Sequence, residues 1–143
     1  MKELIAYAKA HLGLPYIWGG ANPLTGMDCS GFVQWVLESV GMDPQGDQTA
    51  QALYDWSLAK SFGSTRAEGA LVFYGKSAER IHHVAILINE FQIIEAGGGD
   101  SFCTTKEAAA QRGACIRIRP LDHRKDLVGI FMPDYPGWMK LSG

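Results

Sequence analysis

The sequence predicts an α+β protein, and three observations support this class. In the first half of the chain, apolar residues recur at helical spacing, as at Phe32, Val36 and Val40. The second half instead carries short apolar runs of strand length, rich in β-branched and aromatic residues. Helices followed by antiparallel strands are typical of the α+β class. The length of 143 residues suits one domain over residues 1–143.

Three helices are predicted in the first half, each from an apolar stripe at helical spacing. Their predicted spans are residues 1–12, 29–40 and 47–63. Glycine and proline follow the first two spans, and Asp47 is the expected N-cap of the third.

The second half predicts antiparallel strands over residues 70–74, 83–88, 91–96, 115–119 and 128–132. Three glycines at 97–99 indicate a turn after the third strand rather than a phosphate-binding loop, because no helix with a Lys-Ser/Thr signature follows. The tail from Pro133 is interpreted as irregular.

Composition excludes several classes of function. The net charge of −2 gives no basic excess, which argues against a nucleic-acid partner. No apolar run is long enough to span a membrane. The amphipathic N-terminus lacks the core of a signal peptide. We therefore expect a cytoplasmic protein or one delivered by another route: phage lysis, a virion, a secretion system or a larger protein. The oligomeric state is left open.

Cys29 is the candidate nucleophile. It lies where a loop dense in glycine, proline and aromatic residues meets the second predicted helix. A helix N-terminus favours thiolate over thiol, and the thiolate is the reactive form. Three cysteines without short paired spacing do not indicate a disulfide framework, so Cys103 and Cys115 are interpreted as small buried hydrophobes.

His83 is the candidate base, because it begins the most apolar predicted strand. A base of this kind needs an acceptor that orients its other ring nitrogen. If the two strands pair about Asn89 so that 83 faces 95, Glu95 lies within hydrogen-bonding reach of His83. His11 and His123 are expected at the surface.

No metal or cofactor is expected. Cys29, His82 and His83 are possible ligands, but no second short-spaced pair completes a four-coordinate site.

Four stretches carry a specific resemblance to a known family. They are Pro15–Gly20 (Pro-Tyr-Ile-Trp-Gly-Gly), Asp28–Val33 (Asp-Cys-Ser-Gly-Phe-Val), Leu71–Phe73 and His83–Ile86. With them the chain resembles the NlpC/P60 family of papain-like cysteine peptidases, from about residue 14 to about residue 130. The resemblance implies the papain-like NlpC fold, in which N-terminal helices pack on a central antiparallel β-sheet.

The resemblance also implies catalytic roles. Cys29 matches the family's nucleophile, His83 its base, and Tyr16 a tyrosine whose hydroxyl assists the oxyanion. Glu95 falls where the family places a third polar residue, usually histidine and sometimes an amide, so a carboxylate here is a departure. A second departure is Ala70, where many relatives carry aspartate.

Four more residues are candidates for substrate binding: Trp18, Asp28, Ser30 and His82. For three of them a structural role is an equal or better interpretation. Asp28 is expected to cap the second helix, Trp18 to line a groove or pack in the core, and His82 to face solvent, opposite His83.

The family's members cut the peptide stems of bacterial cell wall, so the resemblance implies a cysteine endopeptidase acting on peptidoglycan or its stem peptides at a D-glutamyl–diamino acid bond, as a phage lysin does. Two alternatives stay open. One is an amidase or acyltransferase acting on another amide or a lipid. The other is an inactive module for cell-wall binding or phage tail assembly.

Overall fold

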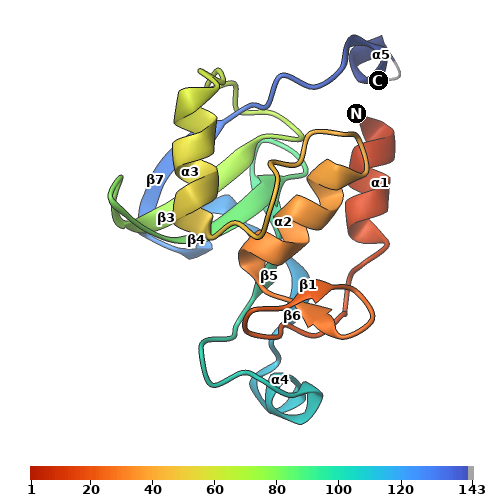
Figure 1. Cartoon of the computed structure of the whole chain (residues 1–143), viewed down its shortest axis with the longest axis vertical. Coiled ribbons are helices and arrows are strands. Elements are labelled where there is room, and N and C mark those ends of the chain that lie inside the picture. Colours follow the sequence, from red (N-terminus) through yellow and green to blue (C-terminus); the bar gives the residue numbers. More distant parts are fainter. Residues whose placement is uncertain (142–143) are drawn as a thin grey trace.

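A computed structural model describes residues 1–141 and confirms the α+β class. A five-stranded antiparallel sheet in the order β6-β5-β4-β3-β7 forms its centre, and α1, α2 and α3 lie across one face of the sheet (Figure 1). The helices are α1 (Lys2–Lys9), α2 (Cys29–Glu38), α3 (Ala50–Ala59), α4 (Lys106–Arg112) and α5 (Gly137–Leu141), with a 3-10 turn η1 (Leu121–His123). The strands are β1 (Ala21–Asn22), β2 (Gly26–Met27), β3 (Leu71–Ser77), β4 (Arg80–Leu87), β5 (Gln92–Gly97), β6 (Cys115–Pro120) and β7 (Leu127–Phe131).

The predicted cap of α3 is wrong. Thr49, not Asp47, is the N-cap, and its Oγ1 accepts a hydrogen bond from the backbone N–H of Ala52 at 3.0 Å. Asp47 lies in the loop before the helix. This loop is held against α2 by a hydrogen bond from the N–H of Gln48 to Oε1 of Gln34 at 2.8 Å. The loop is therefore part of the helical layer.

Two helices were not predicted. Thr105 caps α4, and Gly113 ends it in the left-handed conformation with φ 64°. These are standard start and stop signals, but the alanine-rich segment between them has no apolar stripe. The tail is not wholly irregular, because α5 follows Pro136. This helix lies next to α1 (Figure 1).

The predicted register of the β4–β5 hairpin is wrong by two residues. Ile86 pairs with Ile94 and Leu87 with Ile93, so position 83 corresponds to 97 rather than to Glu95. A shift of two residues keeps every side chain on its face, because side chains alternate with period 2.

The turn explains the shift. The N–H of Ile88 donates to the carbonyl of Gln92 at 3.0 Å, which centres the turn on Glu90 rather than on Asn89. The side chain of Asn89 fixes this turn, since its Oδ1 accepts from the N–H groups of Phe91 and Gln92. Asparagine commonly makes such local bonds in turns.

The two faces of the sheet are buried differently. The larger core lies between the helices and one face and includes Phe32, Leu37, Leu53 and Phe73. The opposite face is covered by a smaller cluster of Ala70, Val72, Tyr74, Ala85, Leu87, Ile93 and Leu121. The hydroxyl of Tyr74 donates to the carbonyl of Leu121 at 2.8 Å, which fixes η1 against this second face.

Gly31 lets the first turn of α2 approach the preceding loop. A Cβ at this position would overlap the carbonyl oxygen of Gly20, a backbone atom that cannot rotate away. We expect Gly31→Ala to lower the free energy of unfolding by roughly 1–3 kcal/mol, the usual cost of overpacking. Urea denaturation measures this, with Gly63→Ala as the control because a Cβ at Gly63 meets no atom within 4 Å. Equal stability of the two variants would contradict the expectation.

Within residues 1–141, no helix combines the length and apolar character needed to cross a membrane.

Candidate active site

The N-terminus of α2 presents Cys29. Asp28 is its N-cap: Oδ1 accepts from the N–H of Gly31 at 2.7 Å, and Oδ2 accepts from the N–H of Gly19 at 3.1 Å. One carboxylate thus starts the helix and holds the preceding loop beside it. The hydroxyl of Ser30 also donates to Asp28, at 3.3 Å. The first N–H groups of a helix have no partner within it, so the N–H of Cys29 is available to an oxyanion.

His83 and Glu95 are hydrogen-bonded in the interior. Nε2 of His83 lies 2.7 Å from Oε1 of Glu95, and the two residues are 7% and 1% exposed. The ring therefore has Nδ1 left for another partner, and Cys29 lines the same cavity as His83, close enough to raise the pKa of its ring. The structure brings Cys29, His83 and Glu95 together in that order.

Two further side chains contact Glu95, and neither was identified from the sequence. Nε of Arg117 donates to Oε2 at 2.9 Å, and Nε2 of His123 lies 3.2 Å from Oε1. Arg117 is the direct cross-strand partner of Glu95 on β6. The alternating pattern of residues 115–119 already indicates that Arg117 and Arg119 share one face of a strand. Only the pairing register of β5 and β6 shows that Arg117 lies opposite Glu95.

His123 is exposed, as expected, whereas His11, also expected at the surface, is buried at 8% exposed. The side chain of His123 is 21% exposed and also reaches the buried carboxylate, because Leu121 anchors η1. Nothing in the local sequence indicates this contact.

The charges of the pair depend on each other. Burial lowers the pKa of His83, but contacts with Cys29 and Glu95 outweigh it and raise the pKa to about 9. Burial raises the pKa of Glu95, and the contacts with His83, Arg117 and His123 outweigh it and lower the pKa to about 2. At neutral pH the pair is therefore an imidazolium and a carboxylate.

The glycines at 97–99 make room for the site. A Cβ at Gly97 would overlap the carboxylate of Glu95, and one at Gly99 would overlap the ring of Tyr16. Tyr16 is 6% exposed, and burial, followed by the charges of Cys29 and Asp28, raises its pKa. The hydroxyl of Tyr16 therefore keeps its proton and remains a donor.

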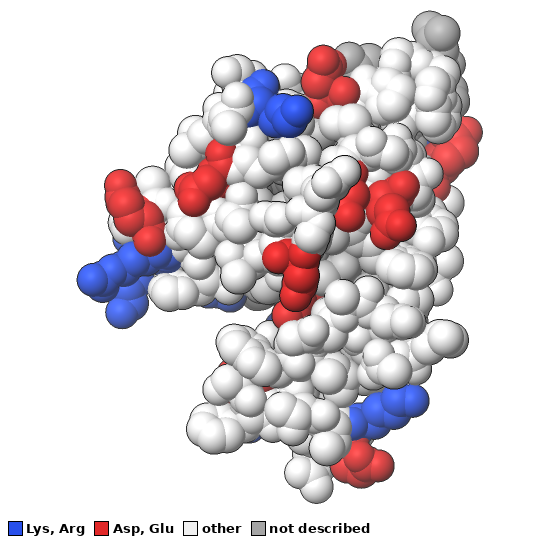
Figure 2. Space-filling view, viewed as in Figure 1, with Lys and Arg blue, Asp and Glu red and all other residues white. Residues whose placement is uncertain are grey.

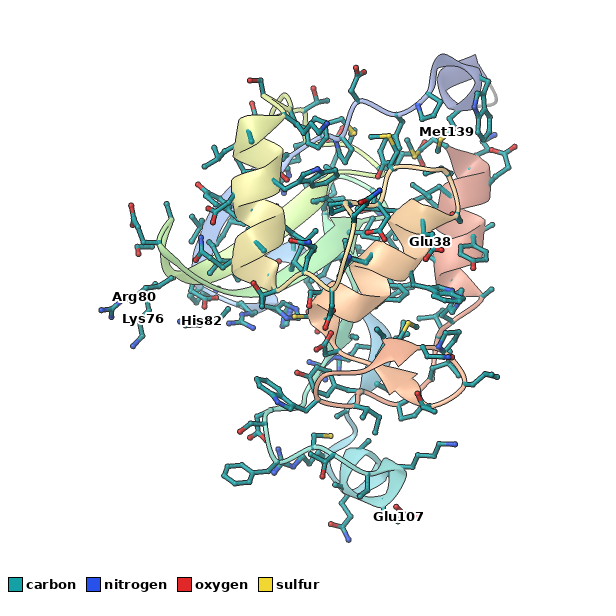
Figure 3. The ribbon with its side chains drawn as sticks, viewed as in Figure 1. Glu38, Lys76, Arg80, His82, Glu107 and Met139 are labelled. Carbon is teal, nitrogen blue, oxygen red and sulfur yellow. The ribbon has the colours of Figure 1, made fainter. Side chains whose placement is uncertain are left out.

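Two cavities meet at Cys29 and form the two arms of one groove. The arms are cavities of about 550 and 380 Å³, and Tyr16, Trp18, Cys29 and His82 line both. Figure 2 shows a hollow between the upper part of the molecule, with α3 and the β3–β4 hairpin, and the lower part, with α4. His82 lies at the lower edge of β4, toward this hollow (Figure 3). Cys29 is only 9% exposed, yet it is reached from both arms.

The arms differ in charge. The larger one, here named the basic arm, is lined by His83, Arg117, His123 and Arg124 together with Glu95 and Asp100. The smaller one, the acidic arm, is lined by Asp28, Ser30 and Asp47 and by no lysine or arginine. The face over α2 and α3 shows more acidic than basic side chains above the hollow (Figure 2).

The four proposed substrate-binding residues all line the groove. Trp18 is 53% exposed, so its ring is a groove wall rather than part of the core. His82 is exposed between the two arms, whereas Asp28 and Ser30 face the acidic arm only. A separate cavity of about 560 Å³ near Phe62 and Tyr135 has no cysteine or histidine in its lining.

In the part of the chain that the structure describes, no three histidine, cysteine or acidic side chains are grouped closely enough to hold a metal ion.

The region that matches known proteins includes Cys29, His83 and Glu95. Residues 13–119 match the profile of the NlpC/P60 family. The probable endopeptidase p60 of Listeria grayi is 39% identical over 93 residues, which is 65% of this chain and 17% of that protein. The bifunctional muramidase/DL-endopeptidase CwlT of Bacillus subtilis is 40% identical over 90 residues, 62% of this chain and 25% of that protein. The chain thus corresponds to a quarter or less of the length of these relatives.

Solved structures agree with the fold. A lipoprotein-like protein of the NLP/P60 family from Staphylococcus aureus superposes with a TM-score of 0.65 at 26% identity. The superposition covers 90% of this chain and 39% of the other.

Proposed function

Because the chain belongs to the NlpC/P60 family, we propose that it is a cysteine endopeptidase that hydrolyses the peptide stems of peptidoglycan at a D-glutamyl–diamino acid bond. The names of its relatives support a cell-wall hydrolase. The observation that carries the proposal is that Cys29, at the start of a helix, lines one cavity with a buried His83 that is hydrogen-bonded to Glu95.

In the first step the sulfur of Cys29 attacks the carbonyl carbon of the scissile amide. Negative charge develops on the carbonyl oxygen, and the N–H of Cys29 donates to it, with the hydroxyl of Tyr16 as a second donor. Donors that are fixed before reaction stabilise such a charge at little reorganisation cost. His83 then gives its proton to the leaving nitrogen, the carbon–nitrogen bond breaks, and a thioester to Cys29 remains.

In the second step water hydrolyses the thioester. His83, now neutral, takes a proton from the attacking water, and the sulfur of Cys29 leaves as the thiolate. Glu95 is a positioning residue in both steps. It accepts a hydrogen bond from Nε2, which keeps Nδ1 directed at the sulfur, and it stabilises the imidazolium.

The two arms take opposite sides of the bond. The leaving nitrogen must be next to His83 to receive its proton, and His83 lines only the basic arm. The residue on the amine side therefore occupies the basic arm. The acyl side, a D-glutamyl residue in this proposal, occupies the acidic arm beside Ser30.

Mass spectrometry of the products tests the proposal. Whole peptidoglycan and free stem peptides are digested in parallel, with Cys29→Ala as the inactive control. We expect new fragments that end in D-glutamate and new amino termini on the diamino acid. Release of the intact stem from its sugar would indicate an amidase instead. The absence of any product from both substrates would contradict a peptidase.

A further inference from the structure

The basic arm has a cationic group that the chemistry above does not use. Arg117 donates to Glu95 through Nε only, and its side chain is 22% exposed. Within residues 1–141 its two terminal nitrogens, Nη1 and Nη2, have no hydrogen-bond partner. They lie over the backbone of Gly97 and Gly98, where a side chain would displace them. The terminal edge of the guanidinium is therefore left for a ligand in the arm.

The other charged groups of the arm are already paired. Arg124 binds Asp126 through Nε and Nη2, at 3.0 and 2.8 Å, and its guanidinium covers the ring of Tyr74. The carboxylate of Asp100 is bound by Arg112 and by the N–H of Phe102. Arg124 thus keeps one terminal nitrogen, Nη1, outside its ion pair and stacks on an aromatic ring, whereas Arg117 keeps both terminal nitrogens for a ligand.

The neighbours of Arg117 orient it. Glu95 is 1% exposed and holds Nε, so the guanidinium plane is fixed by a buried carboxylate. A fixed guanidinium binds a carboxylate with two parallel hydrogen bonds and loses little side-chain freedom on doing so. The same position repels an ammonium group, because the imidazolium of His83 adds a second positive charge.

We propose that Arg117 determines specificity on the amine side of the scissile bond by binding a carboxylate at the end of the diamino acid's side chain. The inference rests on the proposed function and names its substrate class: stems in which the second amino group of the diamino acid is accompanied by a carboxylate, as in diaminopimelate. Stems that contain lysine place a lone ammonium group there and are poor substrates.

The test compares three peptides, L-Ala-γ-D-Glu-X-D-Ala with an amidated C-terminus. X is meso-diaminopimelate, the same residue amidated on its side-chain carboxyl, or lysine. The amidated C-terminus leaves the side-chain carboxylate as the one variable on the amine side. We expect kcat/KM to be roughly 10- to 100-fold higher for the free carboxylate than for the other two, the range of hydrogen bonds between charged groups. In Arg117→Gln this ratio falls to near one.

The ratio separates specificity from positioning. Arg117→Gln also removes a donor from Glu95, but that loss slows all three peptides alike. Arg119→Gln is the matched control: Arg119 is exposed on the same strand, two residues further along and outside the groove, so the ratio stays at the wild-type value. A wild-type ratio near one, or a preference that survives in Arg117→Gln, overturns the inference.

A binding experiment keeps the inference separate from the proposed function. Calorimetry measures binding of the amidated dipeptides X-D-Ala, with the same three X residues, to Cys29→Ala. Tighter binding of the free carboxylate, lost when Arg117→Gln is added, supports the inference even if no bond is cut. Equal binding of all three dipeptides contradicts it, whatever the activity.

Discussion

Replacing Cys29 with alanine is expected to lower kcat/KM for stem peptides by roughly 10⁴-fold or more. In the proposed mechanism the sulfur of Cys29 bonds to the substrate, and no other described thiol lines the groove. The fold should persist, because alanine fits where a cysteine begins a helix and Asp28 still caps it. Release of fragments from purified cell wall measures the activity, and urea denaturation checks the fold.

Cys115→Ala is the matched control. Cys115 is half-buried on β6, outside both arms, so its loss leaves kcat/KM unchanged. Undiminished activity of Cys29→Ala would end the proposal of a cysteine peptidase. Alkylation gives a second measure: Cys29 should react faster than Cys115 at neutral pH, because it faces the start of a helix and a protonated imidazole.

Glu95→Gln is expected to lower kcat/KM on the order of 10⁴-fold, as loss of the orienting carboxylate lowers kcat in a Ser-His-Asp triad. An amide can also donate to Nε2, which favours the wrong tautomer of His83. The variant leaves Arg117 and His83 without their buried counter-charge, so the free energy of unfolding should fall by about 3 kcal/mol. Steady-state kinetics and urea denaturation measure the two effects.

The pH dependence identifies the cause. In the wild type, kcat/KM should decline as pH rises through about 9, where His83 loses its proton. Without the carboxylate this alkaline limit moves down toward the ordinary value of 6.5. An unchanged limit would contradict the assigned role of Glu95. Glu90→Gln, on the exposed turn between β4 and β5, is the control and leaves the limit at about 9.

The free energy of unfolding should also depend on pH through the charges of His83 and Glu95. The pKa of folded His83 is raised, so its contribution is complete below 6.5 and is lost as pH rises through about 9. The pKa of folded Glu95 is lowered, so its contribution is complete above 4.5 and is lost as pH falls through about 2. The difference in unfolding free energy between wild type and Glu95→Gln is therefore largest between pH 4.5 and 6.5.

Local sequence patterns were enough to predict those parts of the site whose structure depends only on neighbouring residues. The cap at Asp28 and the helix that begins at Cys29 could be predicted because each depends on residues within one helical turn. The pairing of His83 with Glu95 was expected from a register that is wrong by two residues. It forms nevertheless, because a shift of two keeps both residues on one face of the sheet.

The rest depends on contacts between distant segments. Arg117 meets Glu95 only through the order of strands in the sheet, and His123 only because Leu121 packs on the second face. No local pattern encodes either. The role of the glycines at 97–99 was also missed. The sequence indicates only a turn at these positions. The structure shows that a side chain at Gly97 or Gly99 would overlap Glu95 or Tyr16.

The two groups that react in the proposed mechanism come from two layers of the molecule: the sulfur is carried by α2, and the imidazole by β4. What joins them across this boundary is apolar packing, which has no directional preference of its own. A slide of about 1 Å between the layers would part sulfur and ring while every helix and strand stayed whole, and a misplacement of that size can cost 100-fold in rate. The tightness of the interlayer core, rather than the persistence of secondary structure, therefore sets the temperature range over which the protein can work.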